Sequence, residues 1–230
     1  MHWWKPFSAR LPCVSGPKRI GRPAKLSRDA ICDATLELVS ESGATAFTMR
    51  ALGEKLGVDP TAVYRHFTDR DDLFREVGDR TLSPVVEGFE PTTDPSKDIA
   101  SLCILLRSTL IANPIGLQIT AQGPTRRPNE LLITEIILSS LKRSGLKVPK
   151  AVIAYHTIIE HTLGSAWLDA PLARAGDNRL ETYTAWRDDY RELDPKVYPA
   201  TRAAAGDLYP ASELVFESGL AALISGLVPH

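Results

Sequence analysis

Residues 48–73, TMRALGEKLGVDPTAVYRHFTDRDDL, constrain the fold more than any other part of the chain. The stretch holds two short segments of periodic apolar residues with a glycine between them. In the first segment Met49, Leu52 and Leu56 recur at offsets of three and seven, which places them on one face of a helix. The pattern predicts a short amphipathic helix that ends in a tight turn.

Residues with capping preferences stand at the ends of both segments. Thr48 occupies the N-cap of the first, and Gly57 follows its last apolar residue, where a left-handed backbone ends a helix. Asp59 caps the second, with Pro60 at the first helical position, where a missing N–H costs nothing. Two short helices joined by such a turn form a helix-turn-helix.

The second helix, expected over residues 60–67, should present two different faces. Val63 and Phe67 lie four residues apart and are expected to face inward. The residues expected to face outward are Thr61, Ala62, Tyr64, Arg65 and His66.

The same segment matches a family signature in one gapless register, through Thr48, Arg50, Leu52, Gly57, Val58, Tyr64, His66, Phe67 and Leu73. Residues 25–80 therefore resemble the DNA-binding domain of the TetR family of bacterial transcriptional regulators. Two positions depart from the family pattern, since Gly53 replaces the usual alanine and Asp59 the usual serine or threonine.

The resemblance implies that the 60–67 helix enters the major groove of double-stranded DNA. Arg65 is the long cation on its outward face, and arginine to guanine is the commonest specific base contact. Phosphate contacts are expected from the surrounding residues. The full expected DNA-binding set is Arg22, Thr48, Arg50, Lys55, Thr61, Ala62, Tyr64, Arg65, His66 and Arg70.

Charge is unevenly distributed along the 230 residues. The net charge of −1 excludes a general polyanion binder, and residues 81–230 are net acidic, which excludes a uniformly basic architectural protein. Residues 1–28 contain lysines and arginines and no acid, so we expect residues 1–25 to be a basic arm that binds phosphate. Arg22, between Gly21 and Pro23, resembles an AT-hook that inserts into a minor groove. A generic basic tail is the alternative, and both interpretations stay open.

The rest of the chain predicts an all-α protein, with a helix-turn-helix domain over 26–80 and a helical ligand-binding and dimerisation domain over 81–230. Expected helices cover 27–43, 48–57, 60–67, 69–81, 98–112, 114–122, 128–144, 149–169, 178–192 and 211–227. The segments 85–97, 170–177 and 194–210 are expected to be linkers or loops because of their proline and glycine content.

The helices at 149–169 and 211–227 are apolar on more than one face and rich in small residues. A helix of this kind needs cover on every side, and a four-helix bundle shared by two subunits supplies it. The family resemblance also implies a homodimer, although an ordinary core helix would show the same periodicity. The expected interface residues are Gly164, Trp167, Leu220, Ala222 and Leu223.

A ligand chamber is expected between the helices at 98–144 and 150–169, because these combine apolar residues with scattered polar ones. The polar residues expected to face a small-molecule effector are Arg107, Gln118, Gln122, His156 and Glu160, with Asn113 and His161 nearby. Each of them could instead be a satisfied core or rim group.

The segment HTIIEH, His156 to His161, invites an alternative in which the chain is a helical enzyme or metal-binding protein using His156 and Glu160. His161 is turned about 100° from Glu160 on a helix, and the spacing fits neither HExxH nor HxxEH. No nucleophile with its base and no phosphate loop has the right spacing.

The sequence thus predicts a ligand-responsive transcriptional regulator rather than an enzyme, with no cofactor or metal. The resemblance implies a repressor released from a palindromic operator, although activators of this family exist. Cys13, Cys32 and Cys103 have no metal-ligand spacing and suit reduced thiols in a cytoplasm. No apolar run approaches the length needed to cross a membrane.

Overall fold

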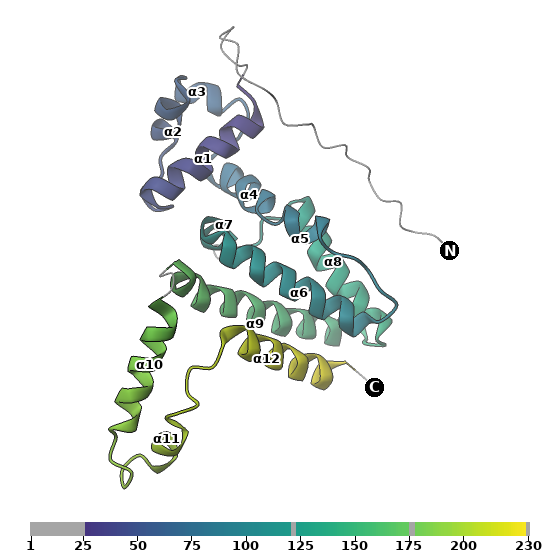
Figure 1. The fold of residues 1–230 in the computed structure, drawn as a ribbon. Helices are drawn as coiled ribbons and strands as arrows, with labels where there is room; N and C mark the ends of the chain where they lie inside the picture. The colour runs from purple at the N-terminus through teal and green to yellow at the C-terminus, as the bar shows by residue number, and fades with distance from the viewer. Residues whose placement is uncertain (1–25, 121–122, 175–177, 229–230) are drawn as a thin grey trace, which may run out of the picture.

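The computed structural model describes residues 26–120, 123–174 and 178–228, and within these ranges the chain forms helices and no strand, as predicted (Figure 1). The helices are α1 Arg28–Ser42, α2 Met49–Leu56, α3 Pro60–Val63, α4 Arg70–Arg80, α5 Ser83–Glu87, α6 Pro95–Ala112, α7 Pro114–Thr120, α8 Pro128–Arg143, α9 Val148–Arg174, α10 Asn178–Arg191, α11 Pro199–Ala204 and α12 Ser212–Leu227. The expected arm, residues 1–25, lies outside the described residues.

Three segments expected to be irregular contain helix. The 85–97 linker overlaps the end of α5 and the start of α6, and α11 lies within the expected 194–210 loop. Pro84, Pro95 and Pro199 stand in the first turn of these helices, so proline begins each of them rather than breaking it. Helix α9 also continues through Pro171 into the expected 170–177 loop, near its C-terminal end, where proline removes few backbone hydrogen bonds.

The predicted caps of the helix-turn-helix are confirmed. The side chains of Ser27, Thr48 and Asp59 accept hydrogen bonds from the backbones of the helices that they precede. Gly57 has φ +67° and ends α2 in the left-handed conformation. Helix α3 is shorter than expected and ends at Val63, after which the chain turns and Phe67 N–H donates to the Val63 carbonyl over 3.1 Å.

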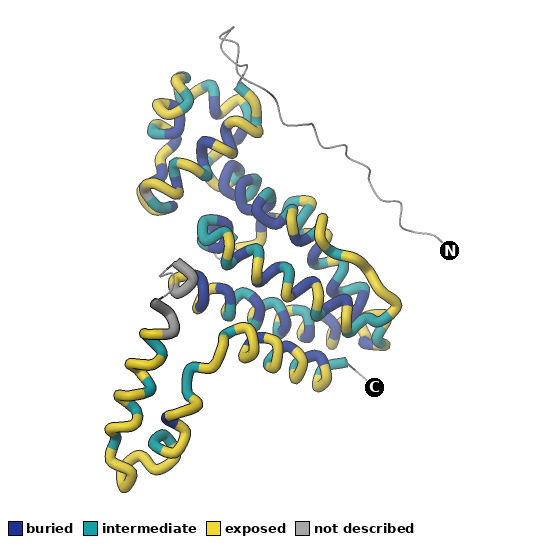
Figure 2. The backbone as a smooth tube through the Cα atoms, viewed as in Figure 1, coloured by how far each residue is buried: buried dark blue, intermediate teal, exposed yellow. Residues whose placement is uncertain are grey.

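The protein has two cores, one on each side of α4. Helices α1 to α4 enclose the first, and α6, α8, α9 and α12 pack around the second, visible as buried stretches in Figure 2. Ile119 of α7 belongs to the first core although it lies far beyond residue 80 in the sequence. Helix α7 therefore ties the helix-turn-helix domain to the rest of the molecule.

Glycines allow α4 and α7 to cross at very short range. A Cβ atom on Gly78 would lie 2.8 Å from Cγ2 of Ile119, and one on Gly116 would lie 2.7 Å from Cβ of Thr81. Real side chains do not tolerate such distances, so the close contact between the two helices depends on both glycines. A movement of α7 would therefore be passed directly to α4.

Helices α10 and α11 project away from the helical body (Figure 1). Aromatic rings hold the projection together, with Trp186 and Tyr190 of α10 at 4.9 and 5.9 Å from the ring of Tyr209. Arg187 donates to the carbonyls of Leu208 and Tyr209 over 2.7 and 2.9 Å. The chain returns from this projection into α12.

In the described ranges, no single helix has the length and apolar character to cross a membrane, and the one pair that does so together, α6 with α7, is bent by 111°.

Candidate functional site

The exposed face of the helix-turn-helix consists of α3 and the turn that follows it. Val63 and Phe67 are buried, as predicted, while Thr61, Tyr64 and Arg65 are exposed, with half of Tyr64 accessible. Among the described residues, Arg65 has no hydrogen-bond or ion-pair partner. A cation held on a rigid element without a counter-charge can contact an external acceptor without first breaking an internal bond.

Asp59 is the departure from the family pattern that bears most on this surface. Its carboxylate accepts from the hydroxyl of Thr61 over 2.6 Å and from the Thr61 N–H over 2.8 Å. These hydrogen bonds lower the pKa of Asp59, the side-chain one most, so the cap carries a negative charge at neutral pH. Thr61, an expected DNA contact, therefore has its hydroxyl committed to the cap.

The remaining residues expected to contact DNA differ in their exposure and in whether their charge is already paired within the domain. Arg50 is largely exposed and its Nε lies 3.0 Å from Glu54, whereas Arg22 lies outside the described residues. The Lys55 ammonium lies 2.9 Å from Glu41 and 3.3 Å from Glu37. It is thus directed toward α1 rather than outward.

Arg70 is also occupied within the domain, contrary to the expectation of a phosphate contact. Its guanidinium donates to the Ala44 carbonyl over 2.9 Å and lies 4.2 Å from the ring centroid of Phe74. Arg70 thus fastens the start of α4 to the loop after α1.

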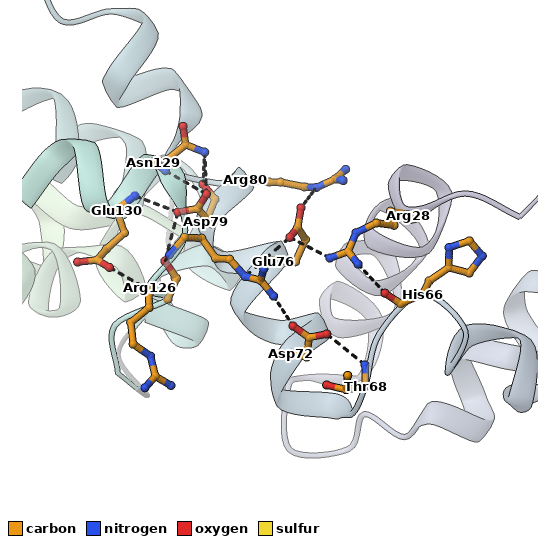
Figure 3. A network of polar contacts seen from close by, with 12 residues as sticks. Arg28, His66, Thr68, Asp72, Glu76, Asp79, Arg80, Arg126, Asn129 and Glu130 are labelled. Carbon is orange, nitrogen blue, oxygen red and sulfur yellow. Dashed lines mark hydrogen bonds and ion pairs between the residues drawn. The ribbon is translucent and has the colours of Figure 1, made fainter.

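Arg28 also holds the helix-turn-helix against α4. Its guanidinium donates to the carbonyl of His66 over 2.5 Å, lies 4.1 Å from the ring centroid of Phe67, and bonds Glu76 of α4 over 3.1 Å. One side chain therefore joins α1, the turn after α3 and α4 (Figure 3).

The second core contains a cavity of about 550 Å³ that meets the description of a small-molecule site. Its wall is mostly apolar and comes from α6, α8, α9 and the segment between α7 and α8. The lining residues are Leu82, Leu106, Leu110, Thr120, Gly123, Pro124, Thr125, Glu130, Ile133, Thr134, Tyr155, His156, Ile159, Glu160 and Leu163.

Polar groups of the cavity form a short chain across two helices. The hydroxyl of Thr134 donates to Glu130 over 3.0 Å and lies 3.0 Å from the phenol of Tyr155. Burial raises the pKa of Tyr155, so the phenol stays protonated at neutral pH and can donate a hydrogen bond. His156 and Glu160 also line the cavity, where the sequence placed them.

The other expected effector contacts lie elsewhere. Arg107 is buried, pairs with Asp169, and donates to Ser165 over 2.9 Å and to Ser212 over 3.3 Å. It fastens α6 to α9 and α12 instead of facing the cavity. Gln118 is not among the lining residues, and Gln122 lies outside the described part of the chain.

The metal-binding alternative finds no support in the geometry. His161 stacks on Phe216 at 5.3 Å, and its Nε2 lies 3.1 Å from the Phe216 carbonyl, away from the cavity. Among the described residues, no group of three histidine, cysteine or acidic side chains converges on a point that could hold a metal ion.

Asp79 connects the cavity wall to α4. The residue is buried, with 5% of its surface exposed. Its carboxylate accepts hydrogen bonds from the backbone N–H groups of Asn129 and Glu130 over 3.1 and 2.9 Å and from the hydroxyl of Thr125 over 3.2 Å (Figure 3). Arg127, at the N-cap of α8, makes no side-chain cap. Asp79 therefore caps α8 from another helix, supplying the acceptor that the local sequence lacks.

Arg127 carries the connection further along α4. Its guanidinium pairs with Asp72 and lies 3.9 Å from Glu76, which in turn bonds Arg28. Since Arg28 donates to the His66 carbonyl, a continuous polar network runs from the cavity wall to the end of the exposed α3 surface. Figure 3 shows this network along α4.

An exposed apolar surface runs along α9 and α12. Its large members are Ile153, Trp167, Leu168, Leu214 and Val215. The expected interface residues Gly164, Trp167 and Ala222 are exposed, and Leu223 is half-buried.

The prediction for Leu220 is wrong, because Leu220 is 2% exposed and packs into the core of the same chain. Gly219, next to it, faces His161, whose Cε1 would lie 2.7 Å from an added Cβ. Gly219 thus allows the close packing of α12 on α9, and Leu220 fills the core beside it.

Comparison with known proteins agrees with this arrangement. The family described as bacterial regulatory proteins, tetR family, matches residues 31–77, and the tetracyclin repressor-like C-terminal domain matches residues 90–229. The chain belongs to the TetR family of transcriptional regulators. Relatives include an HTH-type transcriptional regulator of Saccharopolyspora erythraea, 24% identical over 206 residues, which are 88% of this chain and 84% of that protein. The class A tetracycline repressor protein from transposon 1721 of Escherichia coli is 29% identical over 208 residues, covering 88% and 91%.

Solved structures share the fold across both domains. ActR from Streptomyces coelicolor, in complex with actinorhodin, has a TM-score of 0.77 at 24% identity and covers 89% of this chain and 97% of that one. Another TetR regulator from the same organism has a TM-score of 0.74 at 26% identity, covering 88% and 98%.

Sequence reasoning missed Asp79, although one signal was present. An acidic residue in the last turn of a helix faces the negative end of the helix dipole, so its presence there indicates a partner elsewhere. The start of α8 gives a second signal. It begins with Arg127 and Pro128 and has no side-chain cap of its own, which indicates that an acceptor comes from elsewhere.

Removing the Asp79 carboxylate should destabilise the protein. We expect Asp79→Ala to lower the free energy of unfolding by about 2–3 kcal/mol, because it leaves partly buried N–H donors of α8 without an acceptor. Asp79→Asn should cost less, since an amide oxygen still accepts. Denaturant unfolding at one fixed protein concentration measures both. Asp71→Ala, a change of the same type at an exposed position of α4, should shift stability by no more than about 0.5 kcal/mol. An equal loss in the two alanine variants would contradict the capping role.

Proposed function

We propose that this TetR-family regulator is a repressor, a homodimer that binds a palindromic operator and releases it when a small molecule enters the 550 Å³ cavity. The observation that carries the proposal is the polar network from the cavity wall through Asp79, Arg127 and Arg28 to the His66 carbonyl. A transcriptional regulator has to reach DNA, so we expect this protein to act in the cytoplasm.

DNA reading rests on the exposed face of α3 and its turn. Arg65 is the unpaired cation there, and it would contact a guanine edge in the major groove. Tyr64, half exposed beside it, suits a phosphate, as do Thr48 and Arg50 at the start of α2. Two copies of this surface, one per subunit, would read two half-sites about one DNA turn apart.

The effector is expected to be a mostly apolar molecule with a few hydrogen-bonding groups. The apolar wall would cover its body, while the Glu130, Thr134 and Tyr155 chain and His156 would orient it. The complex of ActR with actinorhodin supports an effector site in this fold.

Release follows from the position of Glu130. Its side chain lines the cavity and its backbone N–H donates to Asp79, so a ligand that displaces the start of α8 also pulls on α4. Helix α4 would then tilt the helix-turn-helix through Arg28. Effector and DNA would oppose one another with a coupling of about 1–3 kcal/mol.

The exposed apolar surface on α9 and α12 would pair with the same surface of a second subunit. Leu168, Leu214 and Val215 are each more than half exposed in a single chain, which is costly for a soluble protein unless a partner covers them. A two-fold axis through this surface would give a four-helix bundle of two α9 and two α12 helices.

Base reading predicts a specific effect of Arg65→Ala. We expect the variant to bind the cognate operator about 1–3 kcal/mol more weakly and to lose discrimination at one base pair per half-site. Competition binding against single-base operator variants, selected with the wild-type protein from random duplexes, measures both. Lys97→Ala, which removes an exposed cation from α6, should bind as the wild type does. A uniform loss across all sequences would make Arg65 a phosphate contact instead.

The dimer surface predicts that a buried charge there separates the subunits. Leu168→Glu or Ala222→Glu should give monomers in sedimentation at micromolar concentration and lose operator affinity, because a single half-site binds weakly. Leu131→Glu on α8, also more than half exposed, should remain dimeric. A monomeric wild type would remove the basis of this proposal.

The polar network predicts an uncoupled variant. Once a thermal-shift screen of small molecules has identified an effector, Arg127→Gln should still bind the effector and the operator. The effector should then release the operator less effectively, because the contact of α8 with Asp72 is lost. Operator titrations with and without effector give the coupling directly. If the effector weakens operator binding by the variant as much as by the wild type, the coupling does not pass through Arg127.

A further inference from the structure

A second hollow shares part of its wall with the cavity described above. It has a volume of about 330 Å³ and is lined by residues of α4 and by residues 123–126, of which 123–125 also line the cavity. From α4 it is lined by Asp71, Phe74 and Arg75, and from α7 by Ile119. Residues 123–125 are thus common to the walls of both spaces.

Two arginines at this hollow lack a counter-charge. Arg75 and Arg126 both line it, and among the described residues neither guanidinium has a hydrogen-bond or ion-pair partner. Other arginines near α4 are paired: Arg28, Arg80 and Arg127 each form an ion pair with a carboxylate of α4. Two uncompensated cations on one concave surface favour a negatively charged ligand.

The backbone of Arg126 is held in an unusual conformation. It has φ +56°, in the left-handed region that residues other than glycine rarely adopt. Its N–H donates to the Glu130 carboxylate over 3.1 Å, which fixes that conformation. Figure 3 shows the Arg126 side chain directed away from the network around Asp79. Such backbone strain persists where the surrounding structure imposes it, commonly at ligand sites.

We propose that this hollow is a second ligand site, which takes a small organic anion with a flat apolar body. Arg75 and Arg126 would bind its carboxylate or phosphate group, and the buried side chains of Phe74 and Ile119 would contact its apolar part. Asp71 opposes this only weakly, because its side chain is largely exposed and lies 3.9 Å from Arg70.

Occupation of the hollow would act on the effector cavity. An anion held by Arg75 of α4 and by Arg126 fastens the 123–126 segment to α4, and Thr125 of this segment lines both spaces. The anion would thereby change the affinity of the cavity for its effector, and the effector would change that of the anion by the same factor. This coupling rests on the proposed function, whereas binding of the anion does not.

Anion binding can be measured on the full-length protein without DNA. We expect isothermal titration calorimetry at constant ionic strength to show binding of benzoate, and Arg75→Gln or Arg126→Gln to weaken it about tenfold or more, because each removes a charged hydrogen-bond donor. Arg191→Gln removes an equivalent charge from α10 and should leave it unchanged. Inorganic phosphate, in parallel, tests whether the charged group alone suffices.

A cavity-filling variant separates this site from the effector cavity. Ile159→Trp occupies the cavity and should retain benzoate binding, with an affinity shifted only by the coupling between the two spaces. Benzoate binding that survives both arginine changes, or that is lost in Ile159→Trp alone, would overturn the second site while leaving the proposed repressor function standing. Unchanged melting temperatures of the arginine variants establish that they are folded.

Discussion

The carboxylate of Asp79 is the interaction on which both halves of the molecule depend. It satisfies backbone donors at the start of α8 and is itself carried by the last turn of α4. Each helix would otherwise have an unfavourable end, α8 without a cap and α4 with an acid at its negative pole. The two defects cancel only while the helices keep this relative position. A single geometry is therefore favoured, and any ligand that disturbs the start of α8 acts on α4.

The crossing of α4 and α7 makes this geometry stiff. Gly78 packs directly against the Ile119 side chain, and Gly116 packs directly against Thr81, so the first core and the second cannot slide independently. Arg28 and Arg70 then hold the helix-turn-helix to α4 on two sides. Rigid contacts of this kind transmit a displacement rather than absorbing it, which a regulator requires between distant sites.

The helix-turn-helix could be predicted from sequence because its determinants are local. Thr48, Gly57 and Asp59 act on residues within a few positions of themselves, and the structure confirms each. The sequence predicts Arg107 as a ligand contact and Leu220 as a partner contact, yet both face the interior of the chain's own fold. A helix that is apolar all round does not reveal which face meets which neighbour, so only tertiary packing decides such roles. Asp79 was missed for the same reason, since its partners lie about 50 residues away.

The arginine proposed to bind DNA and the arginines of the polar network differ in whether a carboxylate neutralises them. Arg28, Arg80 and Arg127 form ion pairs with carboxylates of α4. The charges of the network therefore largely cancel, and little electrostatic potential from it reaches the solvent. Arg65 is unpaired, and its interaction with DNA would be made in competition with counterions. Added salt should accordingly weaken operator binding while leaving the effector-induced change in affinity nearly constant, because partly buried ion pairs are screened much less than exposed charges. A regulator that works as proposed would thus hold its response to an effector over a range of ionic conditions that strongly alter its affinity for DNA.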